Sequence, residues 1–289
     1  MICNLCPRRC EAVRTASGGE GWCRQPSVPV VARAGLHFWE EPTISGTRGS
    51  GTVFFTGCVL GCVFCQNSKI SHDHFGQAVT VPRLREIFEE LIAKGAHNIN
   101  LVSPTPYALA IREALAQPLS VPVVWNTGGY ERVETLRALE KKVQIWLPDL
   151  KYADAVLAAR YSGAGDYFAA TTAAIREMYR QTGDYVLEDG LLKKGVVIRH
   201  LMLPGALDNT KAVMDWVAAN FRPGQVLFSL MAQYTPQPGA EGLLRRRVTK
   251  AEYRAAMAYM ENLGIVDGYC QDMDSARSEY TPDFDLTGI

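Results

Sequence analysis

The run Thr52-Val53-Phe54-Phe55-Thr56-Gly57-Cys58-Val59-Leu60-Gly61-Cys62-Val63-Phe64-Cys65 joins a short apolar segment directly to three cysteines spaced C-x3-C-x2-C. Val, Phe and Thr favour β-strands, and thiolates are the protein ligands of iron–sulfur clusters. A cube of four irons normally takes four thiolates, so a triplet leaves one iron open to a substrate, as an open catalytic zinc site accepts water. Structural zinc is the alternative, but it favours paired C-x2–4-C hooks. The run therefore predicts a strand followed by a loop that holds a [4Fe-4S] cluster through Cys58, Cys62 and Cys65.

Outward from this run, apolar segments that favour strands alternate with segments of helical periodicity. The predicted strands cover residues 52–56, 98–102, 121–125, 143–147, 196–203 and 226–230. The predicted helices cover about 82–92, 107–116, 131–139, 153–182 with an interruption near Gly163 and Gly165, 209–221 and 249–263. This alternation predicts an α/β fold of right-handed βαβ units around a parallel sheet. Periodicity alone fits a doubly wound sheet or a partly open barrel; in a barrel, functional groups gather at the C-terminal strand ends.

Residues 1–50 differ from the rest of the chain, because they are rich in Cys, Gly, Pro and Arg and show little sustained periodicity. We expect a loop-rich, metal-stabilised N-terminal extension here, since so short a segment buries little apolar surface. Residues 51–289 would form the main α/β domain with a C-terminal helix and tail. Four cysteines spaced C-x2-C-x3-C-x12-C would supply the metal ligands: Cys3, Cys6, Cys10 and Cys23. They suit zinc, rubredoxin-like iron or an auxiliary iron–sulfur cluster, and we favour a single zinc or iron ion.

The composition is that of an ordinary globular protein, with 289 residues of which 47% are hydrophobic and 21% charged. Lys plus Arg and Asp plus Glu both number 30, so no basic excess points to nucleic acid as a partner. No apolar run approaches the ~20 residues of a membrane span, and the N-terminus lacks the apolar region of a secretory signal. We therefore expect a cytoplasmic protein whose clustered cysteines are reduced and bind metal.

These motifs resemble the radical S-adenosylmethionine (SAM) family, in which an aromatic residue such as Phe64 precedes the third cysteine. Within it the chain resembles the pyruvate formate-lyase activating enzymes, and residues 44–58 most resemble their uncharacterised PflX-type branch. The resemblance runs from about Gly51 to Thr235. It implies a partial (β/α)6 TIM-like barrel, and an oxidoreductase whose [4Fe-4S] cluster binds SAM and cleaves it reductively to methionine and a 5′-deoxyadenosyl radical.

The resemblance also implies cofactor-binding residues at the strand ends: Ser103, Thr105, Asn126, Thr127, Asp149, Lys151, Arg199 and Tyr234. Asp149 and Lys151 match the activases' D-L-K segment, and Arg199 their SAM-carboxylate arginine. Other positions depart from the activase pattern. Asn126 replaces an Asp, the His that follows the activases' Tyr is absent after Tyr234, and a Ser-Pro-Thr-Pro run stands where activases have G-G-E. His200, next to Arg199, is expected to face away as a satisfied histidine.

The expected function is hydrogen abstraction from a protein or peptide partner, as activases perform, with flavodoxin or ferredoxin as electron donor. One alternative is a radical SAM enzyme for a small molecule, which an N-terminal extension closing the barrel mouth would favour. The other is a non-catalytic metal-binding protein. We expect Cys270 to be a buried structural cysteine. A hydrogen-atom donor is its alternative role, which the polar neighbours Gln271, Asp272 and Asp274 support.

Overall fold

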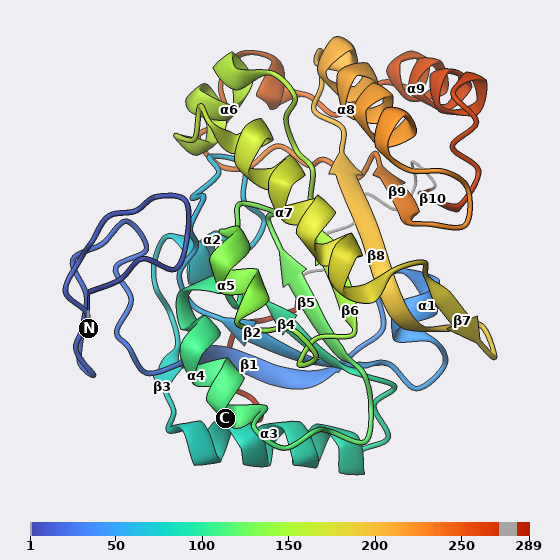
Figure 1. Ribbon diagram of the computed structural model, residues 1–289. Coiled ribbons are helices and arrows are strands. Elements are labelled where there is room, and N and C mark those ends of the chain that lie inside the picture. The colour runs from blue at the N-terminus through green and yellow to red at the C-terminus, as the bar shows by residue number, and fades with distance from the viewer. Residues whose placement is uncertain (1, 272–281) are drawn as a thin grey trace.

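The computed structural model describes residues 2–271 and 282–289, and Figure 1 shows one curved sheet flanked by helices. Asp272 and Asp274 lie outside these residues. The strands are β1 (Val30–His37), β2 (Ser50–Phe55), β3 (Gln77–Ala78), β4 (Ile99–Val102), β5 (Val123–Thr127), β6 (Ile145–Pro148), β7 (Val186–Glu188), β8 (Leu191–Leu201), β9 (Leu227–Met231) and β10 (Gly268–Cys270). The α-helices are α1 (Pro42–Ser45), α2 (Ser68–Ser71), α3 (Val81–Ala93), α4 (Ala108–Ala114), α5 (Val133–Arg137), α6 (Ala155–Ser162), α7 (Tyr167–Thr182), α8 (Leu207–Asn220) and α9 (Lys250–Asn262). Two 3-10 helices are η1 (Thr105–Tyr107) and η2 (Gly242–Arg245).

The strand order across the sheet is β10-β9-β8-β6-β5-β4-β2-β1-β3, and β7 pairs with β8. All pairs from β2 through β4, β5, β6, β8 and β9 to β10 are parallel. The sheet does not close, because β3 and β10 are its two ends. The predicted α/β fold with a partial barrel is therefore confirmed, and all six predicted strands are present. Strands β1, β3, β7 and β10 were not predicted.

The helices begin and end where local chemistry favours it. The Thr80 hydroxyl caps α3 by accepting a hydrogen bond from the Arg83 amide. Gly163 ends α6 in the left-handed conformation, with φ 57°, which glycine adopts without strain. The predicted interruption near this glycine is therefore confirmed as the break between α6 and α7.

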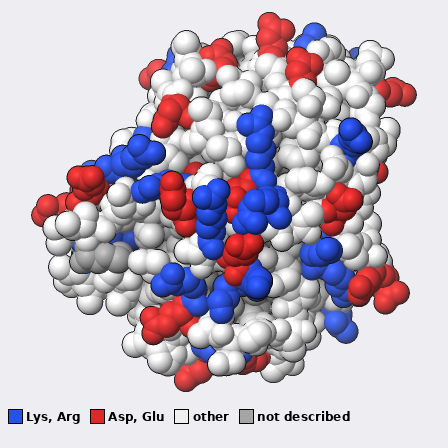
Figure 2. All heavy atoms as spheres, in the orientation of Figure 1, with Lys and Arg blue, Asp and Glu red and all other residues white. Residues whose placement is uncertain are grey.

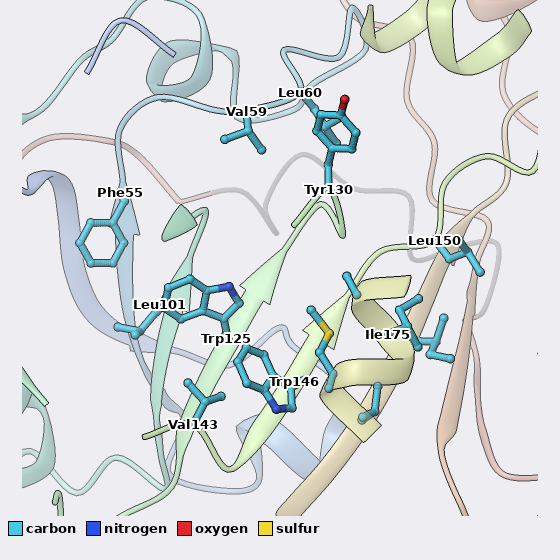
Figure 3. Packing of buried hydrophobic residues seen from close by; sticks show 14 of the residues in the cluster. Phe55, Val59, Leu60, Leu101, Trp125, Tyr130, Val143, Trp146, Leu150 and Ile175 are labelled. Atoms are coloured by element: carbon cyan, nitrogen blue, oxygen red, sulfur yellow. The ribbon is translucent and has the colours of Figure 1, made fainter. Parts of the chain in front are cut away.

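Apolar side chains on the outer face of the sheet pack against the helices. Trp125 and Trp146 from neighbouring strands lie edge to face with ring centroids 6.2 Å apart, and both are fully buried. Figure 3 shows this pair between the sheet and α7, with Ile175 nearby. Figure 1 places α3, α4, α5 and α7 on this side. Because strand residues alternate in direction, the next residues along these strands face the hollow of the sheet.

Part of the N-terminal segment lies inside this hollow. Residues 2–29 are mostly loop, as expected, but β1 pairs antiparallel with β2 and α1 follows it, so the expectation of a loop-rich segment does not hold for residues 30–45. Ile44 of α1 is fully buried against inward-facing residues of four strands: Val124, Ile145, Leu147, Val197 and Leu227. Helix α1 therefore fills the end of the hollow near the N-terminal ends of these strands.

The outer surface carries interspersed charges rather than one continuous basic stripe on the face drawn in Figure 2. Several of them form ion pairs, such as that between Arg180 and Glu140 at 3.1 Å. No helix in the described ranges has the length and apolar character needed to cross a lipid bilayer.

His200 on β8 is completely buried, with its ring nitrogens 2.7 Å from the Leu150 carbonyl oxygen and 3.0 Å from the Thr210 hydroxyl. It faces away from the hollow, as expected. Burial lowers its pKa to about 4, below the usual 6.5. The unfolded chain therefore binds a proton between these pH values that the folded chain does not.

We predict that His200 makes the protein acid-sensitive. The stabilising contribution of the neutral, buried His200 is complete above about pH 6.5 and is lost as the pH falls to about 4. The shift in its pKa corresponds to a decrease of roughly 3 kcal/mol in the free energy of unfolding. Urea unfolding of the wild type and His200→Gln across this range checks it. The free energy of unfolding should fall less steeply with acidification in the variant. Parallel curves for the two proteins would contradict the prediction.

Candidate active site

A cavity of about 310 Å³ opens at the C-terminal ends of the parallel strands. Cys58, Cys62 and Cys65 line one side of it, on the loop that follows β2. Most of the remaining wall comes from the ends of β4, β5, β6, β8, β9 and β10 and from residues 37 and 39–42. The three cysteines predicted to hold a cluster are thus brought to one cavity.

Hydrogen-bond donors surround the three sulfur atoms. The Ser162 hydroxyl donates to Cys62 Sγ at 2.9 Å, and the Ser71 hydroxyl to Cys65 Sγ at 3.2 Å. The Leu60 amide lies 3.4 Å from Cys58 Sγ. Burial raises the pKa of Cys65 to about 12, so this thiol is protonated until a metal takes the place of the proton. Donors aimed at thiolate ligands stabilise them and tune an iron–sulfur cluster.

Asp149 joins two partly buried cations at the cavity wall. Its carboxylate pairs with Lys151 and accepts from Arg199 Nε at 2.9 Å. Arg199 also donates to Asn126 Oδ1 at 2.6 Å and pairs with Glu40 at 3.3 Å. Burial would raise the pKa of Asp149, but the two cations outweigh it and hold that pKa below its usual range. The strand-end residues expected to meet therefore do so, as one charged network.

Glu40 and Glu41 are site residues that the sequence did not reveal. Both line the cavity on the segment between β1 and α1. Glu40 accepts hydrogen bonds from Asn100 at 3.0 Å and Asn126 at 3.1 Å as well as pairing with Arg199. The only sequence signal is the pair of acids before Pro42, a pattern that is common in exposed turns.

Thr105 and Thr127 both donate hydrogen bonds to the buried carboxylate of Glu131, which was not predicted from the sequence. Both hydroxyls donate to Glu131 Oε1 at 2.6 Å, and the Trp125 indole donates to the same atom at 3.1 Å. Thr127 still lines the cavity, whereas Thr105 does not. Gly129 makes this turn possible at φ 82°, because a Cβ there would lie 2.2 Å from the Asp149 carbonyl oxygen.

Of the other expected site residues, one lines the cavity and two do not. Ser103 lines the cavity at the end of β4, in the left-handed region with φ 55°. Tyr234 does not line it; its ring packs 6.1 Å from that of Phe64, and its hydroxyl donates to the Leu244 carbonyl. Cys270 is exposed, so the expectation of a buried cysteine was wrong. Its strand neighbours Tyr269 and Gln271 face the cavity, and Cys270 itself does not line it.

The four N-terminal cysteines lie around a small space of their own beside the cluster loop, near Val59. Arg14, which is buried among them, donates to Cys3 Sγ at 3.7 Å and lowers the pKa of Cys23, although burial raises that pKa more. A buried guanidinium favours thiolates over thiols. No three metal-ligating side chains in residues 2–271 and 282–289 are already arranged to hold one metal ion.

Arg8 connects this cysteine-rich segment to the cluster loop. Its guanidinium donates to the carbonyls of Val59 at 2.8 Å, Leu60 at 3.2 Å and Ser162 at 2.7 Å, and also to that of Gly163. The same group stacks on the ring of Trp22, 3.7 Å from its centroid. One side chain thus holds both the loop between the first two cluster cysteines and the end of α6.

We predict that Arg8→Ala loosens the cluster loop. The lost bonds are charge-assisted but partly solvated, so the free energy of unfolding should fall by about 2 kcal/mol. Iron bound per chain after anaerobic reconstitution should fall as well, since the loop is less ordered. Arg9→Ala is the matched control, because Arg9 is exposed next door. Equal iron content and melting temperature in the two variants would show that Arg8 does not hold the loop.

The fold and the cysteine-lined cavity define a class, an enzyme built on a partial α/β barrel with a three-thiol loop after its first parallel strand. The chain belongs to the radical SAM superfamily, whose family model matches residues 52–217. It is also similar to the uncharacterised protein MJ0674 of Methanocaldococcus jannaschii, with 29% identity over 277 residues, covering 91% of this chain and 75% of that protein.

Solved structures support the same fold. SuiB of Streptococcus suis, solved with SAM bound, matches with a TM-score of 0.53 and 14% identity over 78% of this chain and 51% of its own. Methylornithine synthase PylB matches with a TM-score of 0.51 and 16% identity over 76% of this chain and 65% of its own. The hydrogenase maturase HydG matches with a TM-score of 0.53 and 14% identity over 79% of this chain and 53% of its own. The chain thus spans about half the length of SuiB.

Proposed function

We propose that this protein binds SAM at a [4Fe-4S] cluster held by Cys58, Cys62 and Cys65, cleaves it reductively and uses the resulting radical to abstract hydrogen from a substrate. The observation that carries the proposal is the position of the three thiols. They lie on one loop, face one cavity and receive hydrogen bonds from Ser162 and Ser71. Three local thiolates leave the open metal site that SAM binding requires.

The residues present fit the group that the superfamily implies. When bound, the cluster supplies the single electron that breaks a carbon–sulfur bond of SAM. The chain's own task is to hold SAM next to it. Lys151 and Arg199 provide positive charge for the SAM carboxylate, and Asp149 keeps both cations in place. Thr127 and the backbone of the turn at Gly128 bound the same part of the cavity.

The substrate we favour is a small molecule. Residues 37 and 39–42 line the cavity, and Ile44 closes the hollow beneath it. A cavity of about 310 Å³ is at the lower end of the range for small-ligand sites. Abstraction from a protein or peptide partner, as in the activases, is the second candidate, because a single side chain could reach the cavity from outside.

The N-terminal cysteines form part of the proposal as a second metal site. Cys3, Cys6, Cys10 and Cys23 share a small space, and Arg14 supplies a compensating charge. Zinc, rubredoxin-like iron and an auxiliary cluster remain the candidate occupants. Metal binding there would also stabilise the cluster loop, because Arg8 of the same segment donates hydrogen bonds to the Val59 and Leu60 carbonyls.

The experiment is an anaerobic assay of the reconstituted, reduced protein with SAM, followed by chromatography of 5′-deoxyadenosine. Reduced flavodoxin or ferredoxin serves as electron donor, with dithionite as a chemical substitute. We expect 5′-deoxyadenosine formation above that of the protein kept oxidised. Equal amounts in the two samples would reject the proposed function and favour a non-catalytic metal-binding protein.

A further inference from the structure

Glu41 is a buried carboxylate that faces the cavity with unsatisfied hydrogen-bonding capacity. It is 7% exposed and lies among the cavity-lining residues. Its Oε2 atom has no hydrogen-bond partner within the described residues. The Ser229 hydroxyl on β9 lies close enough to the Glu41 carboxyl group to lower its pKa, although it forms no close hydrogen bond. Gln271 Oε1, just after β10, has no hydrogen-bond partner within the described residues, and both side chains line the same cavity. Three polar side chains whose hydrogen-bonding capacity is incompletely used therefore meet in the wall of one cavity.

Among the charged side chains that line the cavity, the acidic ones outnumber the basic ones, and Glu41 is the acidic side chain that forms no ion pair with a described residue. Glu40, Glu41 and Asp149 are acidic, whereas Lys151 and Arg199 are the basic side chains among the described lining residues, apart from a histidine whose pKa burial lowers to about 4. Lys151 pairs with Asp149, and Arg199 pairs with Asp149 and Glu40. Burial raises the pKa of Glu41, and Arg199 offsets this in part without forming an ion pair with it.

This group lies apart from the cluster loop in the order of the sheet. The cysteines follow β2, whereas Ser229 is on β9 and Gln271 directly follows β10, and these two strands lie at the far end of the sheet. The network around Asp149 comes from the strands between them. SAM bound beside the cysteines and this network would leave the β9–β10 side of the cavity to a second molecule.

Unpaired buried acceptors are uncommon in folded proteins, because each one costs free energy relative to its hydration in water. Each such group in a native structure needs an explanation, and at the wall of a cavity a bound ligand that satisfies it is one. Acceptors without donors call for a ligand that donates, and an excess carboxylate calls for one that is positively charged. The aromatic residues Trp39 and Tyr269 line the same cavity, and aromatic faces also attract cations.

We infer that Glu41, together with Ser229 and Gln271, binds an ammonium or guanidinium group of the substrate. This inference rests on the proposed function for the reaction that follows binding. It defines the substrate as a cationic small molecule held by its charged group at the β9–β10 side, with its remaining atoms directed towards the SAM side.

A stability measurement separates this role from a structural one. Glu41→Gln removes a buried charge that no cation in the described residues pairs with, so the melting temperature of the ligand-free protein should rise. A fall in melting temperature would show that Glu41 is needed for folding and would overturn the inference. Glu188→Gln is the matched control, because Glu188 is exposed on β7 and its change should leave the melting temperature as it is.

A binding measurement tests the ligand class. Calorimetric titration of the cluster-loaded, SAM-saturated protein uses n-butylammonium as the probe and n-butanol as its neutral counterpart. We expect the ammonium to bind more tightly than the alcohol, and Glu41→Gln to weaken it by about tenfold or more, the value of one charge-assisted hydrogen bond. Glu188→Gln should bind it like the wild type. Equal affinity for the two probes, or an unchanged affinity in Glu41→Gln, overturns the inference.

Two further readouts keep this test separate from the proposed function. The SAM dissociation constant should be the same in Glu41→Gln and the wild type; a tenfold loss would assign Glu41 to the SAM site and overturn the inference. Formation of 5′-deoxyadenosine is measured on the same wild-type sample. Its absence, with selective ammonium binding intact, would reject the proposed reaction and leave the cation site standing.

Discussion

Cys58→Ala should reduce 5′-deoxyadenosine formation from SAM to the level of the oxidised protein. The variant retains Cys62 and Cys65, but two thiolates hold a four-iron cube too weakly to leave one iron open for SAM. Loss of a partner that merely orients a metal ligand costs about 10–100-fold in metal affinity or activity, so loss of the ligand itself should cost more. The measurement is product formed per chain after identical anaerobic reconstitution.

Cys270→Ala is the matched control for this change. Cys270 is exposed and does not line the cavity, so its replacement should leave 5′-deoxyadenosine formation unchanged. Product formation in Cys58→Ala at the wild-type level would mean that the cluster is elsewhere. Loss of product in both variants would point to general damage from cysteine replacement instead of to a ligand.

The same Cys58→Ala protein also identifies the second metal. Once the SAM cluster is absent, the metal that remains reports on the N-terminal cysteines, such as Cys6 and Cys23. One zinc per chain indicates a structural ion, one iron a rubredoxin-like site, and four irons an auxiliary cluster. Metal analysis beside the double variant Cys58→Ala, Cys6→Ala decides among them, because that protein should lose the remaining metal.

Local signals were sufficient to predict six of the strands, the three-cysteine loop after β2 and the placement of Asp149 and Arg199 at strand ends. Apolar β-prone runs mark every parallel strand from β2 to β9, and these strands end at one edge of the sheet, so polar and charged residues at their ends converge. Cysteine spacing needs no knowledge of the fold. These features can be predicted because they depend only on neighbouring residues in the sequence and on the rule that parallel strands end at one edge of the sheet.

Glu40 and Glu41 could not be predicted, because their position depends on where the segment between β1 and α1 passes through the hollow. That path is set by the packing of Ile44 against four strands, which leaves no periodic signal in residues 38–45. Two acids before a proline otherwise suggest an exposed turn. The prediction that Cys270 is buried was wrong for a related reason. An apolar run before it suggested burial, whereas strand alternation at the end of the sheet turns its side chain outward.

Asp149→Ala should be the most destabilising single change in the site. Asp149 is 9% exposed and is the shared partner of Lys151 and Arg199. Its removal leaves Lys151, which is only partly exposed, with no carboxylate partner and Arg199 with Glu40 alone. Breaking a buried ion pair by removing one partner costs about 3–5 kcal/mol, which corresponds to a fall in melting temperature of roughly 6–20 °C for a chain of this size.

The pH dependence of that loss identifies its cause. The pKa of Asp149 is held below its usual value, so its stabilising contribution is complete at neutral pH and is lost only as the pH falls through that lowered pKa. The difference between wild type and Asp149→Ala should therefore be constant from pH 7 down to about pH 5 and shrink below it. Asp208→Ala, at an exposed helix start, should cost no more than about 1 kcal/mol. A similarly small cost for Asp149→Ala would mean that Glu40 alone holds Arg199, and that SAM binding relies on the N-terminal segment instead of on the strand end.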